Sequence, residues 1–225
     1  FDDRWWCTFR EAEDHGPSIG AVRVITSQDG AEWQSVAVLE QQEVDLRDPK
    51  LSVTPDGRLM LVMGGCVYGS GEHGTRSPRI AFSSDGANWT APQKVLAEDH
   101  WLWRVTWHGN SGYGVTYQPA KATSQVFLMR TGDGISYRLV SALKIPDRPN
   151  EATIRFGHRE EMRIVVLNEG GNHKGYLGTA PPPYTDFSWR KVDLRLGGPD
   201  LVRTPGGKWV LASRRYTSPT RTVFG

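Results

Sequence analysis

The sequence has few of the features that mark membrane, metal-binding or nucleic-acid-binding proteins. It holds only two cysteines, Cys7 and Cys66, which lie far apart and outside any CxxC or Cys/His spacing, so we expect no zinc site, other metal or redox motif. No stretch approaches the run of about 18 apolar residues needed for a membrane helix. The formal net charge is +2, with the 27 basic and 25 acidic residues interspersed. We therefore expect no membrane or nucleic-acid partner and no cofactor.

Helical periodicity is also nearly absent. Apolar residues instead alternate over short runs such as 21–26, or form short blocks such as 164–167, each close to Gly, Asp or Asn. The chain is rich in residues that end strands or pack between layers, with 25 Gly, 14 Pro and nine Trp. This pattern predicts an all-β protein built from short strands and tight turns.

One turn recurs along the chain, in the form Ser/Thr-x-Asp-Gly-x-x-aromatic. Its aspartates are Asp29, Asp85 and Asp133, spaced by 56 and 48 residues. In such a turn the carboxylate can accept backbone N–H groups, the glycine supplies a positive φ, and the aromatic residue is expected to pack between neighbouring sheets. We interpret these aspartates as structural and not as metal ligands or catalytic acids.

A second set of segments recurs between those turns. The segments align without gaps and are residues 58–65, 112–119, 162–169 and 208–215, with 4–11 in the same register. Together the two sets predict a unit of four strands in roughly 50 residues, which is a propeller blade. The expected single domain, 1–225, holds blades at 1–41, 42–97, 98–144, 145–194 and 195–225. The first and last blades each lack a strand, giving about four and a half four-stranded blades of a longer ring.

Charged residues occupy equivalent positions of this repeat, where the chain enters the innermost strand or leaves the second one. In a propeller these positions surround the mouth of the central channel. The candidate site residues among them are Arg10, Glu11, Arg47, Asp48, Arg104, Glu151, Arg214 and Arg215. Convergent arginines and carboxylates suit an acidic sugar, because guanidinium binds carboxylate through two parallel hydrogen bonds. The alternative is that these charges solvate the rim or form salt bridges between blades.

Several segments resemble the sialidase (neuraminidase) superfamily of bacterial proteins with BNR or Asp-box repeats. The segments are residues 6–11, 24–30, 45–51, 150–156, 181–186 and 197–200. The resemblance implies a sialidase-type β-propeller, with six blades when complete. It also implies secretion or a periplasmic location.

The resemblance assigns roles to single residues. Asp48 would be the acid/base, and Glu151 the glutamate that polarises a tyrosine nucleophile, a tyrosine being the sialidase exception among glycosidases. Arg10 would be the first carboxylate-binding arginine and Arg214 or Arg215 a later one, with Arg47 and Arg104 as further ligand contacts. The tyrosine itself would lie beyond residue 225, because Tyr216 follows the arginine pair too closely.

Three functions follow from these expectations. The first is an exo-acting, sialidase-like glycoside hydrolase that removes terminal sialic acid or a related acidic sugar from glycans. The second is a non-catalytic carbohydrate-binding propeller. This function agrees with Glu11 and Ala12, which stand where sialidases have Ile-Pro, and with Trp101, Trp103 and Trp107, whose rings could stack on sugars. The third is a glycosidase or polysaccharide lyase of different specificity, since a shared fold does not fix an activity.

Overall fold

The computed structural model describes residues 1–69, 74–118, 125–217 and 221–224. Over these ranges the regular structure is all strand, apart from one 3-10 turn at His158–Glu160. The all-β prediction is confirmed. Among the described residues, no helix is long and apolar enough to cross a membrane.

The chain divides into two compact units, which are described separately. Unit 1 comprises residues 1–112 and 131–137, and unit 2 comprises residues 113–130 and 138–225. Each sheet is a meander, in which strands that follow one another along the chain are hydrogen-bonded neighbours. This is the connectivity expected of propeller blades.

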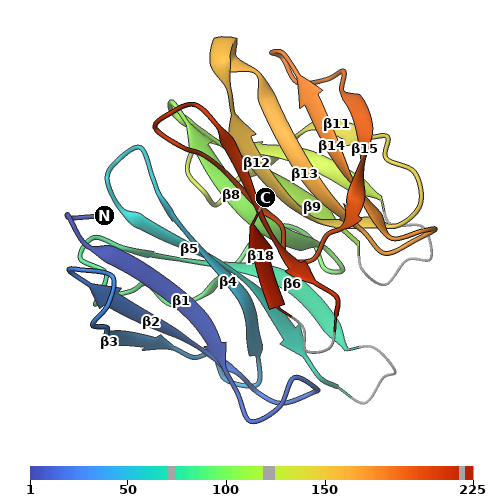
Figure 1. Cartoon of the computed structure of the whole chain (residues 1–225). Coiled ribbons are helices and arrows are strands. Elements are labelled where there is room, and N and C mark those ends of the chain that lie inside the picture. Colours follow the sequence, from blue (N-terminus) through green and yellow to red (C-terminus); the bar gives the residue numbers. More distant parts are fainter. Residues whose placement is uncertain (70–73, 119–124, 218–220, 225) are drawn as a thin grey trace. The chain divides into compact units, whose positions relative to one another are not determined.

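Unit 1 contains two complete sheets (Figure 1). The first has the order β1-β2-β3 and the second the order β4-β5-β6-β7. The strands of the first are β1 (Trp5–Glu11), β2 (Ala21–Ser27) and β3 (Gln34–Leu39), and those of the second are β4 (Asp45–Val53), β5 (Leu59–Val67), β6 (Thr75–Ser83) and β7 (Gln93–Lys94). Strand β5 is buried at eight of its nine residues, which explains its continuous apolar sequence: a strand covered on both faces has no polar side.

A third sheet has the order β11-β10-β9-β8. Its strands are β8 (Trp101–His108), β9 (Ser111–Tyr117), β10 (Val126–Thr131) and β11 (Tyr137–Leu143). Strand β8 belongs to unit 1, where Leu102 and Val105 pack with Met60, Val62 and Ile80 in one apolar cluster.

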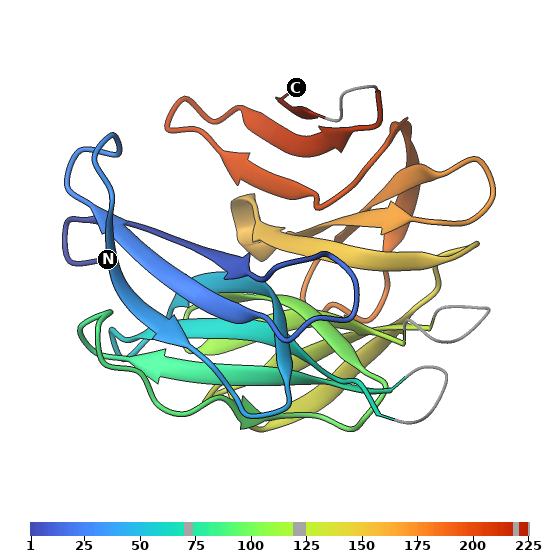
Figure 2. The same ribbon diagram turned by 90° about the horizontal axis from the view of Figure 1, so that it is seen from below.

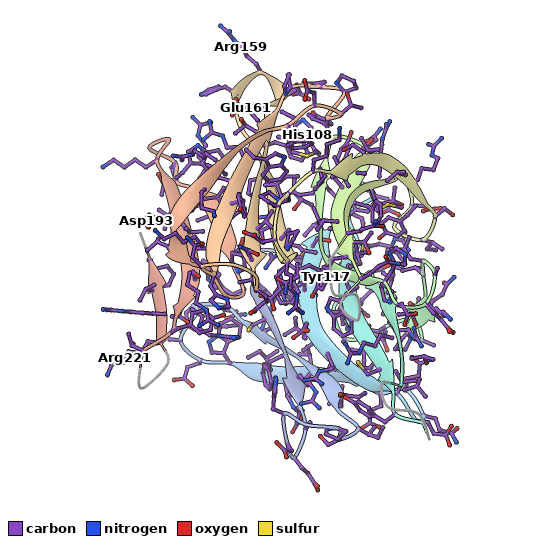
Figure 3. All side chains as sticks on the ribbon, turned by 90° about the vertical axis from the view of Figure 1, so that its right-hand side faces the viewer. His108, Tyr117, Arg159, Glu161, Asp193 and Arg221 are labelled. Carbon is purple, nitrogen blue, oxygen red and sulfur yellow. The ribbon has the colours of Figure 1, made fainter. Side chains whose placement is uncertain are left out.

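Unit 2 contains two further sheets, drawn in orange and red in Figure 2. They have the orders β12-β13-β14-β15 and β16-β17-β18. The strands are β12 (Pro149–Phe156), β13 (Met162–Asn168), β14 (Lys174–Ala180), β15 (Ser188–Arg195), β16 (Asp200–Arg203), β17 (Trp209–Arg215) and β18 (Arg221–Phe224). Arg159, in the turn between β12 and β13, points away from the ribbon (Figure 3).

The three Asp-Gly turns are built as the sequence predicts. In each, one carboxylate oxygen accepts the backbone N–H groups two and three residues further on, at 2.7–2.9 Å. Gly30, Gly86 and Gly134 have φ of 77°, 77° and 78°. The N–H groups of Glu32 and then Ala31 are the main causes that lower the pKa of Asp29 to about 2. One oxygen of each carboxylate is thus occupied by N–H groups of its own turn.

The aromatic residues of these turns behave less uniformly than expected. Trp89 packs against the core of the first two sheets, as predicted. Trp33 is 39% exposed, so the expectation that it packs between sheets is wrong. It lies at the outer strand of the first sheet, and its indole N–H donates to the carbonyl of Gly30 at 3.2 Å. Both cysteines are free thiols, with Cys66 buried and Cys7 exposed.

Candidate functional site

A buried carboxylate, Asp45, organises the candidate residues of unit 1. Asp45 begins β4 and has no solvent exposure. One oxygen accepts the Nε–H of Arg10 at 2.9 Å and the backbone N–H of Gly20 at 3.0 Å. The other accepts the hydroxyl of Tyr68 at 2.6 Å and lies 3.5 Å from Nη1 of Arg47. Two predicted site residues, Arg10 and Arg47, are therefore brought together by a residue that sequence reasoning missed.

Backbone geometry explains why this cluster forms. In the β4–β5 ladder Asp45 is paired with Cys66, which places Tyr68, just after β5, at the same end of the sheet. Gly20 lies on the other side, where a side chain would collide with the ion pair: an added Cβ would be 2.6 Å from both Nε of Arg10 and Oδ1 of Asp45. The glycine is required by the space that the ion pair occupies.

The charges in this cluster shift the pKa values of its members. Burial by itself would lower the pKa of Arg47, but the hydrogen bond to Tyr68 and the negative charge of Asp45 outweigh burial, so the pKa is raised. Burial and then the hydrogen bond to Asp45 raise the pKa of Tyr68. At neutral pH the cluster therefore contains a neutral phenol and a cationic guanidinium.

Asp48 lies on an irregular part of the same strand. The β4–β5 register shifts between Arg47 and Lys50, and Asp48 has a φ of +48° and an exposed side chain. Such bulges and left-handed non-glycine residues are enriched at functional sites, where they redirect side chains. The ammonium of Lys50 donates to the backbone carbonyl of Asp48 at 3.1 Å and lies 4.1 Å from the ring centroid of Trp103.

The other predicted residues of unit 1 lie in different surroundings. Glu11 is exposed and forms an ion pair with Arg23, 2.7 Å from Nε of the arginine, and this hydrogen bond lowers the pKa of Glu11. Arg104 is partly buried in β8, between Trp103 and Val105. Ligand binding by Glu11 and Arg104 stays a prediction.

In unit 2, Glu151 lies on β12. Its Oε2 accepts the backbone N–H of Gly198 at 2.7 Å, in the segment that leads into β16. Arg155, on the same strand, forms an ion pair with Asp200 at 2.7 Å. Glu151 is thus fixed next to the link between two sheets, and its catalytic role stays a prediction.

Arg214 and Arg215 lie at the end of β17 and are both exposed. The guanidinium of Arg214 is 5.9 Å from the ring centroid of Tyr216, and that of Arg195 is 3.9 Å from the same ring. Arg215 is directly opposite Arg221 of β18, which lies at the outer edge of unit 2 (Figure 3). Tyr216 serves here as a surface for two cations, while its hydroxyl donates to the carbonyl of Leu196 at 3.4 Å.

Possible metal ligands can be compared over the part of the chain that the structure describes. No group of three or more His, Cys, Asp or Glu side chains there is arranged to hold a metal ion. The chemistry available to these residues is acid–base chemistry and the binding of anions.

Comparisons with known proteins identify the fold. No family model matches the chain, and no curated protein matches its sequence. Among solved structures, a protein of unknown function from Dyadobacter fermentans matches with a TM-score of 0.83 and 13% identity, over 99% of this chain and 75% of that one. An α-L-arabinofuranosidase from Fusarium graminearum matches with a TM-score of 0.74 and 14% identity, over 94% and 71%. A β-fructofuranosidase from Bombyx mori matches with a TM-score of 0.68 and 13% identity, over 94% and 52%.

These similarities show an all-β, five-bladed propeller with four-stranded blades. They do not support the expectations of six blades and of a sialidase-type propeller. The physical reason is that the Asp-Gly turn, one of the features on which the resemblance rested, is held by hydrogen bonds within its own few residues. It therefore reports local structure and not the number of blades.

Proposed function

We propose that this protein is a glycoside hydrolase that cleaves a terminal acidic sugar from a glycan. The observation that carries the proposal is that Arg47 and Asp48 are adjacent on the irregular part of β4. Arg47 is held near the buried carboxylate of Asp45, while the side chain of Asp48 is exposed. Arg47 supplies a cation for the sugar's carboxylate, and Asp48 supplies a carboxyl group to protonate the leaving oxygen. Similarity to propellers that act on arabinofuranosides and fructofuranosides supports the glycosidase class.

Most glycoside hydrolases use a second carboxylate, as nucleophile or as base for a water molecule. The sequence resemblance assigns a catalytic role to Glu151, which is held in place by the N–H of Gly198 while remaining partly accessible. The acidic sugar named by the sequence resemblance is sialic acid. The similar structures do not favour sialic acid over a uronic acid, so both belong in the test.

The experiment is a hydrolysis assay on fluorogenic methylumbelliferyl glycosides of sialic acid, glucuronic acid, arabinofuranose and xylose. Wild type is compared with Asp48→Asn, Glu151→Gln and, as a matched control, Asp186→Asn, which changes an exposed aspartate in unit 2. We expect release from an acidic glycoside, a loss of about 100-fold or more in the first two variants, and a change below about twofold in the control.

Two other outcomes would change the proposal. Release only from the neutral glycosides would keep the glycosidase and discard the acidic sugar. No release from any glycoside, with sugar binding retained, would establish the non-catalytic carbohydrate-binding function.

A further inference from the structure

We propose that Arg47 and the hydroxyl of Tyr68 form the ligand-binding element of this site, with Arg47 binding the anion and Tyr68 accepting a sugar hydroxyl, and that Arg10 and Asp45 position them without contacting the ligand. The identity of the ligand, the carboxylate of an acidic sugar, rests on the proposed function. The different roles assigned to the four residues follow from hydrogen bonds within unit 1.

Arg10 has too few hydrogen-bond donors left to bind a carboxylate through two hydrogen bonds. A guanidinium carries five N–H groups. Nε donates to Asp45 at 2.9 Å, and Nη1 to the carbonyl of Asp14 at 2.7 Å. Nη2 donates to the carbonyl and the hydroxyl of Ser18 at 3.1 and 3.3 Å. One N–H remains, and binding a carboxylate through two parallel hydrogen bonds needs two.

Arg47, unlike Arg10, has enough unused N–H donors to bind a carboxylate through two hydrogen bonds. Nη1 donates to the hydroxyl of Tyr68 at 3.1 Å and Nη2 to the carbonyl of His15 at 3.0 Å. Within the described residues its other three N–H groups, including Nε–H, make no hydrogen bond. Its side chain is 18% exposed, so these donors are enough to hold a carboxylate bidentately.

Asp45 sets the direction of the tyrosine hydroxyl. Because the hydroxyl donates to Asp45 and accepts from Arg47, its proton is fixed toward the interior. A hydroxyl oxygen has a second lone pair, and Tyr68 is 38% exposed. Tyr68 is therefore an acceptor for a hydroxyl group of the sugar, while Arg47 takes the anion. Asp45 is fully buried and has its two oxygens occupied from within the protein, which makes it a positioning residue.

The connection between β1 and β2, residues 12–20, depends on the same cluster. Arg10 binds it at Asp14 and Ser18, Arg47 binds it at His15, and Asp45 binds it at Gly20. Loss of Arg10 or Asp45 therefore releases this connection, whether or not a ligand is present. Its amide hydrogen exchange is a readout of positioning that does not depend on activity.

The experiment measures two quantities in Arg47→Lys, Tyr68→Phe, Arg10→Lys and Asp45→Asn, with Arg190→Lys as the matched control on an exposed arginine of unit 2. One is the amide exchange of residues 12–20. The other is the dissociation constant for sialic acid and for glucuronic acid, with glucose as the neutral probe.

We expect Arg47→Lys to weaken acidic-sugar binding about tenfold or more, and Tyr68→Phe about threefold to tenfold, each with exchange of residues 12–20 changed less than about threefold. Arg10→Lys and Asp45→Asn should speed exchange of residues 12–20 about tenfold or more. The control should change neither quantity.

Two results would overturn the proposal. One is that Arg10→Lys weakens binding as much as Arg47→Lys does while leaving exchange unchanged. The other is that neither Arg10→Lys nor Asp45→Asn affects exchange. If wild type binds neither acidic sugar, the anion-binding role of Arg47 and the proposed ligand fail together, while the exchange data still decide the positioning roles of Arg10 and Asp45.

Discussion

The two units hold their candidate residues in different ways. In unit 1, Arg10 and Arg47 converge on Asp45, which is fully buried, accepts three hydrogen bonds and lies 3.5 Å from Nη1 of Arg47. In unit 2, Arg214 and Arg215 are exposed at the end of an outer hairpin, and Arg214 has an aromatic ring for its partner. Binding and catalytic groups are most effective when their rotamers are locked by surrounding contacts. By this criterion the candidate residues of unit 1 are better organised than those of unit 2.

The units also differ in charge. Unit 1 contains 17 acidic and 10 basic residues, and unit 2 contains 8 acidic and 17 basic residues, giving formal net charges of −7 and +9 that add to the +2 of the chain. This segregation is hidden in the total charge. If the ligand is the acidic sugar of the proposed function, the positive charge of unit 2 would raise its local concentration and speed its association.

Removal of the buried carboxylate should produce the largest difference between the units. Asp45→Asn leaves two arginines without their counter-charge, and we expect a loss of about 3–5 kcal/mol in the free energy of unfolding. Asp200→Asn breaks the more exposed ion pair with Arg155 in unit 2, and we expect a loss below about 1 kcal/mol. Urea denaturation of both variants measures this difference. Equal losses would contradict the description of unit 1 as the more tightly organised unit.

A smaller difference is expected for two glycines. Gly20→Ala forces a methyl group between Arg10 and Asp45, and we expect a destabilisation of about 1–3 kcal/mol together with faster amide exchange in residues 12–20. Gly198→Ala meets no atom within 4 Å, and only its φ of +53° opposes the substitution, at about 1 kcal/mol. Denaturation curves and exchange rates test the pair. An unchanged exchange rate in Gly20→Ala would show that the site tolerates the added methyl group.

Two tyrosine hydroxyls should respond to removal with opposite signs. The hydroxyl of Tyr137, in unit 1, is buried without a hydrogen-bond partner among the described residues, so Tyr137→Phe should stabilise by up to about 1 kcal/mol. The hydroxyl of Tyr176, in unit 2, donates to Asp147 at 3.2 Å, so Tyr176→Phe should destabilise by about 0.5–1.5 kcal/mol. Thermal unfolding of both variants tests the signs, and a destabilised Tyr137→Phe would indicate a partner for that hydroxyl.

The smallest effect concerns acid stability. The pKa of Asp29 is about 2 in the folded protein, below the value of about 3.9 for an unfolded aspartate. The contribution of Asp29 to the free energy of unfolding is therefore fully present above about pH 4 and is lost as the pH falls through about 2. Asp29→Asn should flatten the pH dependence of stability in this window, and Asp186→Asn in unit 2 should not. Urea denaturation at several pH values measures both slopes, and equal slopes would contradict the role of the turn.

The sequence predicted local features well and long-range ones only in part. The Asp-Gly turns were predictable because each is closed by groups within a few residues. The repeat register also placed Arg47 where the chain enters an innermost strand and Arg10 where it leaves a second strand. Asp45 was missed, although it lies two residues before Arg47, because its partners Arg10 and Tyr68 are 35 and 23 residues away. The number of blades was mispredicted because it depends on packing between sheets, which no local motif encodes.

The central claim, that Asp48 protonates the leaving oxygen of a glycoside, has a direct test. Turnover by wild type and Asp48→Asn is measured on two glycosides of the acidic sugar that wild type cleaves, one releasing dinitrophenol and the other methylumbelliferone. Dinitrophenol leaves without protonation, so a missing general acid affects it least. We predict that Asp48→Asn loses about 100-fold or more in turnover on the methylumbelliferyl glycoside and less than about tenfold on the dinitrophenyl glycoside. Equal losses on the two substrates would contradict the role of Asp48 as the acid.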